Sequence, residues 1–480
     1  MVAFAEIAVG VPVEGTFTYR VPEALVADVT VGRRVRVPFG ARKMTGFVVQ
    51  TAPSPAKSFS GETKDVLEAL DDGPMLEPDE LALARWIAEY YRHPLGLVLK
   101  TVLPAGLEGG RVKAKTERVF TLPTMLAFGD ASATKRRAPA QEKVLEAIRT
   151  EGPLSSSAVR ERFGARGAAA AAELVKKGLL ALEHEEVLRA PSAAGAALVA
   201  HEPATAPALY PAQEAALAAL SEAIRARAFA PFLLQGVTGS GKTEVYLRAI
   251  ALALELGRTA LVLVPEIALT PQLTGRFRAR FGDRIAVLHS GLSDGQRYDE
   301  WRRIKRGDAT IAVGARSAVF APLKNLGIVV VDEEHDGSYK QDEGLRYHAR
   351  DVAVVRAQRA GAAVVMGSAT PSLETFQNAV AGRYRRLVLP ERVGARPLPP
   401  VDRVQLTNLR ARGPLSPRLL SAIEETLAAG KQTILFLNRR GFAPSLVCDD
   451  CAHVITCPDC AVAMIFHSPG LAKKGPKNRE

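Results

Sequence analysis

Six short apolar runs in the middle of the chain limit what this sequence can fold into. They read PFLLQ, TALVLVP, RIAVLH, TIAVG, GIVVVD and AAVVMG, and stretches with helical spacing separate them. Strands that are apolar on both faces belong to a sheet with both faces covered, and intervening helices indicate parallel strand order. The sequence therefore predicts a doubly wound α/β domain over residues 209–395.

The first of these runs leads directly into a phosphate-binding motif. The segment QGVTGSGKTEVY fits G-x-x-x-x-G-K-[ST] and stands between a predicted strand and a predicted helix. Backbone N–H groups of such a loop surround a phosphate, the lysine reaches its terminal oxygens, and the threonine hydroxyl holds Mg²⁺. A structural glycine-rich loop is the alternative, but the setting favours nucleotide binding. The predicted cofactor-binding residues of this loop are Gly236, Gly239, Ser240, Gly241, Lys242 and Thr243.

An acidic pair after another apolar run supplies the second half of such a site. In GIVVVDEEHD, Asp332 is placed to coordinate Mg²⁺ and Glu333 to polarise an attacking water. Acidic runs usually begin solvated helices, but a buried strand directly before the acids argues against that reading. We predict Lys242, Asp332 and Glu333 as the catalytic residues, with Thr243 and Asp332 as the magnesium ligands.

The first part of the chain, residues 1–110, has a different pattern. Alternating segments such as AEIAVGVPV, GTFTYRVP and GRRVRVPFG predict a small β-rich domain, and the helical spacing of PDELALARWIAEYYRHPLGLVLKTVLP predicts a closing helix. Basic residues crowd around a turn that contains Phe39 and Gly40. They could hold a nucleic-acid strand by phosphate contact and stacking, or discourage pairing at a solvated hairpin edge. The basic residues are Arg33, Arg34, Arg36, Arg42 and Lys43.

Two further segments precede the α/β domain. Residues 115–190 read as three short helices followed by a strand, the pattern of a winged helix, which binds duplexes or proteins. Residues 191–208 are low in complexity and predict a linker.

Charge and cysteine usage bound the partners and the compartment. The formal charge of +12 and the pI of about 9.6 indicate a polyanionic partner. The sequence has neither a long uncharged apolar run nor a secretion signal, and its four cysteines stand at metal-ligand spacing. These features predict a cytoplasmic protein in a reducing compartment.

The cysteines gather in CDDCAHVITCPDC near the end of the chain. Two C-x-x-C pairs can together supply the four thiolates of a tetrahedral zinc site, although the spacer between them is short for a zinc ribbon. The predicted zinc ligands are Cys448, Cys451, Cys457 and Cys460.

Ordered motifs give the chain a specific resemblance. GVTGSGKT, LVPEIALTPQ, GARSAVFAP, DEEHD, GSATP and LFLNRRGFAP follow the order of a superfamily 2 helicase, and the set resembles the PriA family of primosomal replication-restart helicases. GTFTYRVPE, RVRVPFG and HPLG extend the resemblance to residues 1 to about 460. It implies a RecA-like lobe, ATP-dependent DNA unwinding with 3′ to 5′ translocation, and binding to branched and single-stranded DNA. Primosome proteins and single-stranded DNA-binding protein are the implied protein partners.

The resemblance also assigns residues. It implies that Phe17, Gly40 and Lys64 hold the 3′ end of a nascent strand, although Thr18 stands where the family usually has an acid. Gln213 matches a glutamine that reads adenine. The aromatic-rich segment after DEEH, together with the arginine of GARSAVFAP, is implied to contact DNA; these residues are Arg316, Tyr339, Lys340, Tyr347, His348 and Arg350. Ser368 to Thr370 are expected to bridge the nucleotide to the DNA-bound lobe.

The end of the chain departs from the family. The resemblance implies eight cysteines in two interleaved zinc sites, and this chain has four. Residues 415–480 offer one helix and one strand, QTILFLN, as the start of a second helicase lobe. We therefore expect a chain truncated within that lobe, with incomplete zinc sites and slow ATP hydrolysis. The rival functions are a fork-binding scaffold without turnover and a different superfamily 2 translocase; RVRVPFG argues against the latter.

Overall fold

The computed structural model describes residues 4–54, 63–107, 112, 115–123, 138–187, 189, 207–394, 400–404, 415–436, 453–458 and 464. The chain divides into two compact units, Met1–Arg396 and Pro397–Glu480. Among the described residues, no helix combines the length and the apolar character that crossing a bilayer requires. The finer domain boundaries drawn from the sequence stay predictions.

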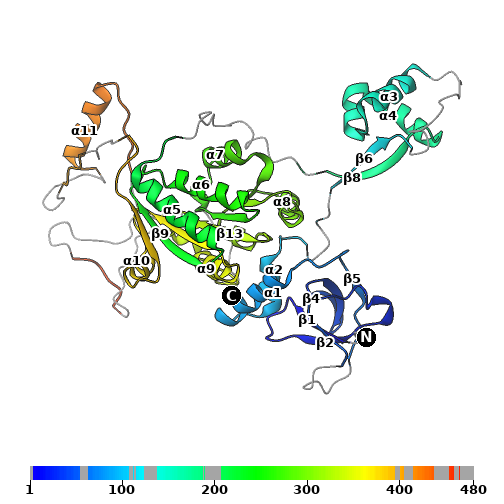
Figure 1. The fold of residues 1–480 in the computed structure, drawn as a ribbon, viewed down its shortest axis with the longest axis horizontal. Coiled ribbons are helices and arrows are strands. Elements are labelled where there is room, and N and C mark those ends of the chain that lie inside the picture. Colours follow the sequence, from blue (N-terminus) through cyan, green and yellow to red (C-terminus); the bar gives the residue numbers. More distant parts are fainter. Residues whose placement is uncertain are drawn as a thin grey trace. The chain divides into compact units, whose positions relative to one another are not determined.

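The first unit contains a seven-stranded parallel sheet, of which Figure 1 labels β9 and β13. The strand order is β11-β12-β10-β13-β14-β9-β15. All six predicted apolar runs are strands of this sheet, and the edge strand β15 was not predicted. The strands are β9 (Ala230–Gly236), β10 (Thr259–Leu263), β11 (Ile285–Leu288), β12 (Ile311–Gly314), β13 (Leu326–Val331), β14 (Ala363–Ser368) and β15 (Arg385–Leu389). The predicted doubly wound α/β domain is confirmed.

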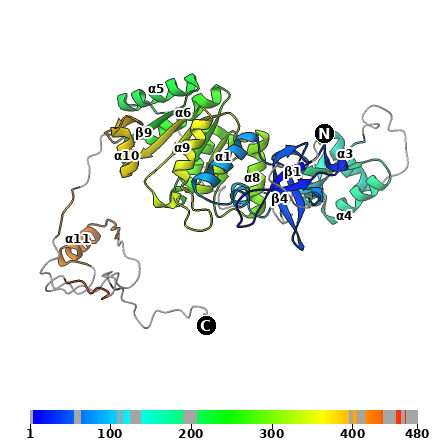
Figure 2. The ribbon, with the colours of Figure 1, turned by 90° about the horizontal axis from the view of Figure 1, so that it is seen from below.

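Helices cover both faces of this sheet, as Figure 2 shows for α5 and α6 on one side and α9 on the other. One core joins the sheet to α5, α6 and α7, and a second joins it to α8, α9, α1 and α2. The helices of the lobe are α5 (Pro211–Ala226), α6 (Lys242–Glu255), α7 (Pro271–Phe281), α8 (Asp294–Arg306), α9 (Ala349–Arg359) and α10 (Leu373–Val380).

The N-terminal region forms an antiparallel sheet of order β2-β1-β4-β3-β5. Its strands are β1 (Phe4–Val9), β2 (Phe17–Arg20), β3 (Arg34–Phe39), β4 (Arg42–Ala52) and β5 (Glu68–Ala69). β4 and β5 were not predicted. The predicted closing helix is two helices, α1 (Pro78–Tyr90) and α2 (Leu95–Val102), because Pro94 interrupts the helical backbone between them.

The segment predicted as a winged helix contains α3 (Pro139–Glu151), α4 (Ser156–Lys176) and the sheet β7-β6-β8. Gly164 has a non-helical conformation inside α4 (φ 65°, ψ −167°), so α4 consists of two helices that meet at a kink, where the sequence predicted a second and a third helix. The strands are β6 (Thr116–Thr121), β7 (Leu154–Ser155) and β8 (Ala181–Glu186), of which β6 and β7 were missed.

In the second unit the described residues contain one helix, α11 (Pro417–Ala428). The predicted strand QTILFLN is wrong for its described part, because residues 431–436 have no regular secondary structure. A strand needs a neighbour to satisfy its backbone groups, and the described residues of this unit supply none.

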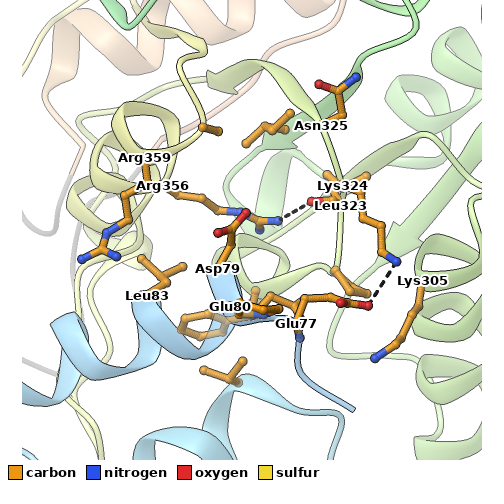
Figure 3. A pocket seen from close by; sticks show the side chains of 16 residues that line it. Glu77, Asp79, Glu80, Leu83, Lys305, Leu323, Lys324, Asn325, Arg356 and Arg359 are labelled. Atoms are coloured by element: carbon orange, nitrogen blue, oxygen red, sulfur yellow. Dashed lines mark hydrogen bonds and ion pairs between the residues drawn. The ribbon is translucent and has the colours of Figure 1, made fainter. Parts of the chain in front are cut away.

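The N-terminal helix α1 packs against the parallel-sheet lobe around a cavity of about 530 Å³ (Figure 3). Glu77, before α1, pairs with Lys324 at 3.1 Å, and Lys305 of α8 donates to the carbonyls of Pro74 and Met75 at 2.6 and 2.7 Å. The partly buried Arg356 of α9 points into the same junction (Figure 3), and desolvation lowers its pKa to about 10.

Arg356 ties the loop after β12 to α9. Its guanidinium donates to the carbonyls of Val319 and Ala321, each at 2.5 Å. These bonds compensate the cost of burying the charge and satisfy carbonyls at the end of the 3₁₀ helix Arg316–Phe320 and directly after it.

We predict that Arg356→Met lowers the free energy of unfolding of this unit by about 2 to 5 kcal/mol, because each buried acceptor left without a donor costs about 1–3 kcal/mol. Arg359→Met, at an exposed position of the same helix, is the control and should change stability little. Thermal unfolding of both variants provides the comparison. Equal melting temperatures would contradict this role for Arg356.

Candidate nucleotide site and DNA-contact residues

The glycine-rich loop between β9 and α6 has the backbone of a phosphate-binding loop. Gly239 and Gly241 take positive φ angles of 82° and 80°, which L side chains rarely adopt. A Cβ on Gly241 would also lie 2.3 Å from the side-chain nitrogen of Gln213. α6 begins at Lys242, so its free N-terminal amides face the loop, as anion binding at a helix N-terminus requires.

Lys242 is buried and held at the mouth of the loop. Its ammonium donates to the carbonyl of Gly236 at 2.9 Å and lies 3.9 Å from a carboxylate oxygen of Glu333. The structure thus brings together the lysine of one motif and the acid of the other, which the sequence separates by 91 positions (333 minus 242).

The acidic pair follows β13, and its surroundings disfavour the ionised carboxylate of Asp332. Burial, reinforced by the charge of neighbouring Glu333, raises the pKa of Asp332. Glu333 has a positive φ of 43°, a conformation that non-glycine residues rarely adopt. Backbone strain of this kind is often found at functional sites, where the surrounding structure enforces it.

A tyrosine that sequence reasoning missed fixes Asp332. Tyr246, one turn into α6 and fully buried, donates its hydroxyl to the Asp332 carboxylate at 3.0 Å. The contact crosses Gly367 of β14, where a Cβ would lie 1.6 Å from the tyrosine oxygen. Helical spacing from Lys242 to Tyr246 places both on the α6 face that meets the acids. A tyrosine one helical turn after the lysine of the phosphate-binding motif was the sequence signal that could have identified this residue.

A second missed residue, Glu334, joins the acidic motif to the segment after β14. Its buried carboxylate accepts hydrogen bonds from the backbone N–H of Ser372 at 2.7 Å and from the hydroxyl of Thr375 at 2.8 Å. Arg350 of α9 pairs with it at 3.1 Å and also donates to the Ser372 hydroxyl at 2.8 Å. Through these contacts the Glu334 carboxylate holds α9 and α10 against the end of β13.

Ser368, predicted to bridge nucleotide and DNA elements, lies at the end of β14. Its hydroxyl is 2.8 Å from Nδ1 of His335 and accepts the N–H of Thr370 at 3.0 Å. The acidic motif and the GSATP segment are therefore in direct contact, while the bridging role stays a prediction.

Gln213 lies beside the phosphate-binding loop, as predicted, but its amide is engaged within the protein. Its side-chain oxygen accepts the N–H of Tyr210 at 2.9 Å, and its NH₂ group donates to the carbonyl of Ser240 at 2.8 Å. Reading adenine with the same amide requires exchange of these bonds.

The expectation that Tyr339 and Tyr347 offer stacking surfaces for DNA disagrees with the structure. Their side chains are 0% and 2% exposed, and the Tyr339 hydroxyl donates to the backbone carbonyl of Asp332 at 2.6 Å. Burial raises the pKa of Tyr347 to about 12. The segment folds back through an antiparallel bridge between Lys340 and His348. Since side chains alternate across paired strands, the two tyrosines face the core.

The other predicted DNA residues of this region divide into two groups. Arg350 is largely buried in its pair with Glu334, so in this structure it serves packing. Lys340 is exposed, and Arg316 donates to the Lys340 carbonyl at 2.7 Å. The backbone N–H of His348 donates to the Tyr91 hydroxyl at 3.1 Å, and burial lowers the pKa of its imidazole.

In the N-terminal sheet, two of the three predicted 3′-end residues lie together. Phe17 packs edge-on against Phe39 at 5.1 Å between ring centroids, and Gly40 follows Phe39 in the β3–β4 turn. Lys64 pairs through its backbone with Arg20, at the other end of β2.

The threonine that departs from the family pattern contacts an acidic side chain. Thr18 donates its hydroxyl to Glu6 of β1 at 2.5 Å, so a carboxylate does stand next to this strand.

The basic residues around the turn differ in their exposure and in their ion pairs. Arg33 and Arg34 are buried, and Arg34 makes a two-bond ion pair with Asp71 at 2.5 and 2.9 Å. Arg36 pairs with Glu68 at 2.6 Å. Arg42 and Lys43, at the tip of the hairpin, are exposed. The buried pair therefore fits neither sequence interpretation, and for the exposed pair both interpretations stay predictions.

Of the predicted zinc ligands, Cys457 lies within the described residues, and Cys448, Cys451 and Cys460 lie outside them. Within the part of the chain that is described, no cluster of three or more potential metal-ligating side chains occurs. Zinc binding stays a prediction.

We predict that Gly367→Ala damages the site, because its Cβ would collide with the Tyr246 hydroxyl. Overpacking of this kind costs about 1–3 kcal/mol, and it should also weaken binding of an ATP analogue. Tyr246→Phe removes the colliding oxygen, so the double variant should recover part of the lost stability. Thermal unfolding of the two single variants and the double variant measures the coupling. Strict additivity would rule out the close approach.

Comparisons with known proteins agree with this architecture. Residues 6–104 match the family model of a 3′ DNA-binding domain named for PriA, and residues 210–379 match that of the DEAD/DEAH box helicases. The second match covers the strands β9 to β14, the phosphate-binding loop and the acidic motif described above, so the parallel-sheet domain is a RecA-like helicase lobe.

Three relatives align with nearly the entire chain, all named replication restart protein PriA. The protein from Bacillus subtilis is 37% identical over 98% of this chain and 66% of its own length. Those from Haemophilus influenzae and Treponema pallidum are 38% and 36% identical, over 96% and 97% of this chain and 62% and 59% of their own lengths. The chain therefore spans about three fifths to two thirds of these relatives. On this similarity and both family models, the chain belongs to the PriA family of replication restart proteins.

Proposed function

We propose that this chain is the ATP-binding and fork-binding part of a DNA helicase of the replication-restart primosome. The single observation that carries the proposal is the convergence of Lys242, Asp332 and Glu333 at one edge of the parallel sheet, in a chain of the PriA family. An acid pair facing a phosphate-binding lysine is the arrangement that nucleotide hydrolysis by P-loop motors requires.

The roles of the individual groups follow from their surroundings. Lys242 places a positive charge at the mouth of the loop, where it neutralises phosphate oxygens. Asp332 is held by Tyr246 at a fixed position, which favours metal coordination over movement. Glu333 lies 3.9 Å from Lys242 and projects from a strained backbone, which places its carboxylate to orient a water molecule.

The residues present also fit a magnesium ion. Asp332 offers a carboxylate whose pKa is raised by desolvation and by the charge of Glu333, and a bound cation would offset that cost. Thr243, beside Lys242 on α6, offers the hydroxyl that P-loop sites use. Magnesium supplies charge neutralisation at the phosphates when bound.

DNA recognition is proposed for the N-terminal sheet and the loop after β13. The exposed Arg42 and Lys43 beside Gly40, and the exposed Lys340, can contact phosphates. Binding to branched DNA with a free 3′ end follows from the match to the 3′ DNA-binding domain. Primosome proteins and single-stranded DNA-binding protein are proposed partners on family grounds alone, and zinc is proposed on the cysteine spacing.

Lys242→Ala should weaken binding of a non-hydrolysable ATP analogue by between about tenfold and a hundredfold, since hydrogen bonds to charged groups contribute about 1.5–3 kcal/mol. Affinity for forked DNA should stay within about twofold, because Lys242 lies in the nucleotide site. Calorimetry and fluorescence anisotropy give the two affinities, with Arg385→Ala on the exposed edge strand as control. Equal nucleotide affinity in all three proteins would reject the proposed site.

Replacing both Arg42 and Lys43 with alanine should weaken fork binding and lower the slope of log affinity against log salt by about two, one for each lost phosphate contact. Replacing Arg36, which is paired with Glu68, should change the slope little. Fluorescence anisotropy at several salt concentrations measures it. An unchanged slope in the double variant would mean that the hairpin tip does not touch DNA.

A further inference from the structure

Helix α8 carries a row of residues that contacts the end of the α3–α4 segment, by which we mean α3, α4 and the sheet β7-β6-β8. The residues of this row are three or four positions apart and therefore share one helix face; they are Gly295, Asp299, Arg302 and Arg306. Glu186, the last residue of β8, accepts hydrogen bonds from both Arg302 and Arg306. Ion pairs thus attach the α3–α4 segment to the parallel-sheet lobe.

A second contact, which we call the pin, joins Arg189 to Asp299. The backbone N–H of Arg189 donates to the Asp299 carboxylate at 2.9 Å, and the guanidinium donates to the same carboxylate at 2.9 and 3.1 Å. Asp299 is 2% exposed. Gly295 leaves room for this approach, because a Cβ there would lie 2.7 Å from Nε of Arg189. Breaking a buried pair is strongly unfavourable, so we expect the pin to persist.

The contact of Glu186 with the two arginines, which we call the latch, is more accessible to solvent. The side chains of Glu186 and Arg306 are 39% and 52% exposed. Ion pairs at exposed positions contribute little to stability and are screened by salt. The hydrogen bond from Arg306 lowers the pKa of Glu186, so the carboxylate stays ionised at neutral pH. The latch can therefore open when another anion competes for the arginines, while the pin holds.

The two arginines of the latch have unused binding capacity. One carboxylate bonds to two guanidinium groups, so the three groups together carry one net positive charge. The side chain of Arg302 is 9% exposed, and its Nε is buried without a hydrogen-bond partner among the described residues. Such a group is costly and usually faces a ligand or water. A phosphate group offers several acceptor oxygens and suits paired guanidinium groups.

The surroundings of α8 favour DNA as the source of that phosphate. Lys305 of the same helix donates to the carbonyls of Pro74 and Met75, in the region that matches the 3′ DNA-binding family model. Helix α8 therefore lies next to the domain that is proposed to hold DNA. For this reason we favour the DNA backbone over free phosphate.

We propose that Arg302 and Arg306 form a contact site on α8 for DNA backbone phosphate, and that Glu186 blocks this site in the DNA-free protein. A phosphate that binds the two arginines displaces Glu186 and releases the α3–α4 segment from α8, while the pin keeps it attached at Arg189. Glu186 is then an autoinhibitory residue. The inference rests on the proposed function, because it takes DNA to be the polyanion that this chain binds.

The first test compares two substitutions on neighbouring residues of β8 in the full chain. Glu186→Gln removes the charge of the latch and should strengthen binding of forked DNA by about twofold to fivefold, the range for an exposed ion pair. Glu185→Gln makes the same charge change at an adjacent exposed position and should leave the affinity unchanged. Arg306→Ala should lower the slope of log affinity against log salt by about one, for one lost phosphate contact. Fluorescence anisotropy measures all three.

The second test measures release of the α3–α4 segment by fluorescence energy transfer. Dyes are placed at Glu142 of α3 and Glu255 of α6, both exposed. Forked DNA should change the distribution of dye distances in the unmodified chain, and Glu186→Gln should show the changed distribution without DNA. Inorganic phosphate at matched ionic strength should change it less than DNA does. An equal change with inorganic phosphate would overturn DNA as the source.

The outcomes separate the inference from the proposed function. If the unmodified chain does not bind forked DNA, the proposed function fails. If it binds and the Glu186→Gln and Glu185→Gln variants have equal affinities, Glu186 does not compete with DNA and the inference alone fails. A distance distribution that DNA leaves unchanged would also overturn it. Unchanged affinity of each variant for an ATP analogue verifies that the lobe is folded.

Discussion

The contact between Tyr246 and Asp332 holds the nucleotide site together. It spans three adjacent strands of the sheet, from the helix after β9, over β14, to the end of β13. This close approach is possible because Gly367 has no side chain at the crossing point. The hydroxyl stabilises a carboxylate that burial would otherwise favour in its protonated form. The contact therefore depends on the strand order, on Gly367 and on Tyr246 together.

Around this contact, the residues after β13 form a buried polar network. Glu334 has its carboxylate satisfied by Arg350, Ser372 and Thr375, and Tyr339 bonds to the backbone of Asp332. A buried ion pair is tolerated when its remaining hydrogen-bonding capacity is filled, and removal of one partner is strongly destabilising. The network makes the acidic motif, α9 and α10 rigid with respect to each other. A DNA contact on this loop would therefore act directly on the acidic motif.

Much of the fold was predictable from the apolar runs and the glycine-rich motif, because each of these signals lies within a few consecutive residues. Each apolar run is one buried strand, and the glycine-rich motif sets the backbone between β9 and α6. The edge strand β15 and the N-terminal β4 were missed because their sequences mix polar and apolar residues, as expected of strands with one exposed side. Tyr339 and Tyr347 were misjudged for a related reason. Their sequence surroundings are charged, and only the bridge between Lys340 and His348 turns them inward.

The sequence by itself determined the doubly wound lobe, the phosphate-binding loop and the acidic pair, because residues adjacent along the chain encode each of them. The tertiary structure decided which distant groups meet: Tyr246 with Asp332, and Glu334 with Arg350. These pairings depend on the order in which parallel strands lie side by side. That order is a property of long-range packing, and no local sequence pattern specifies it.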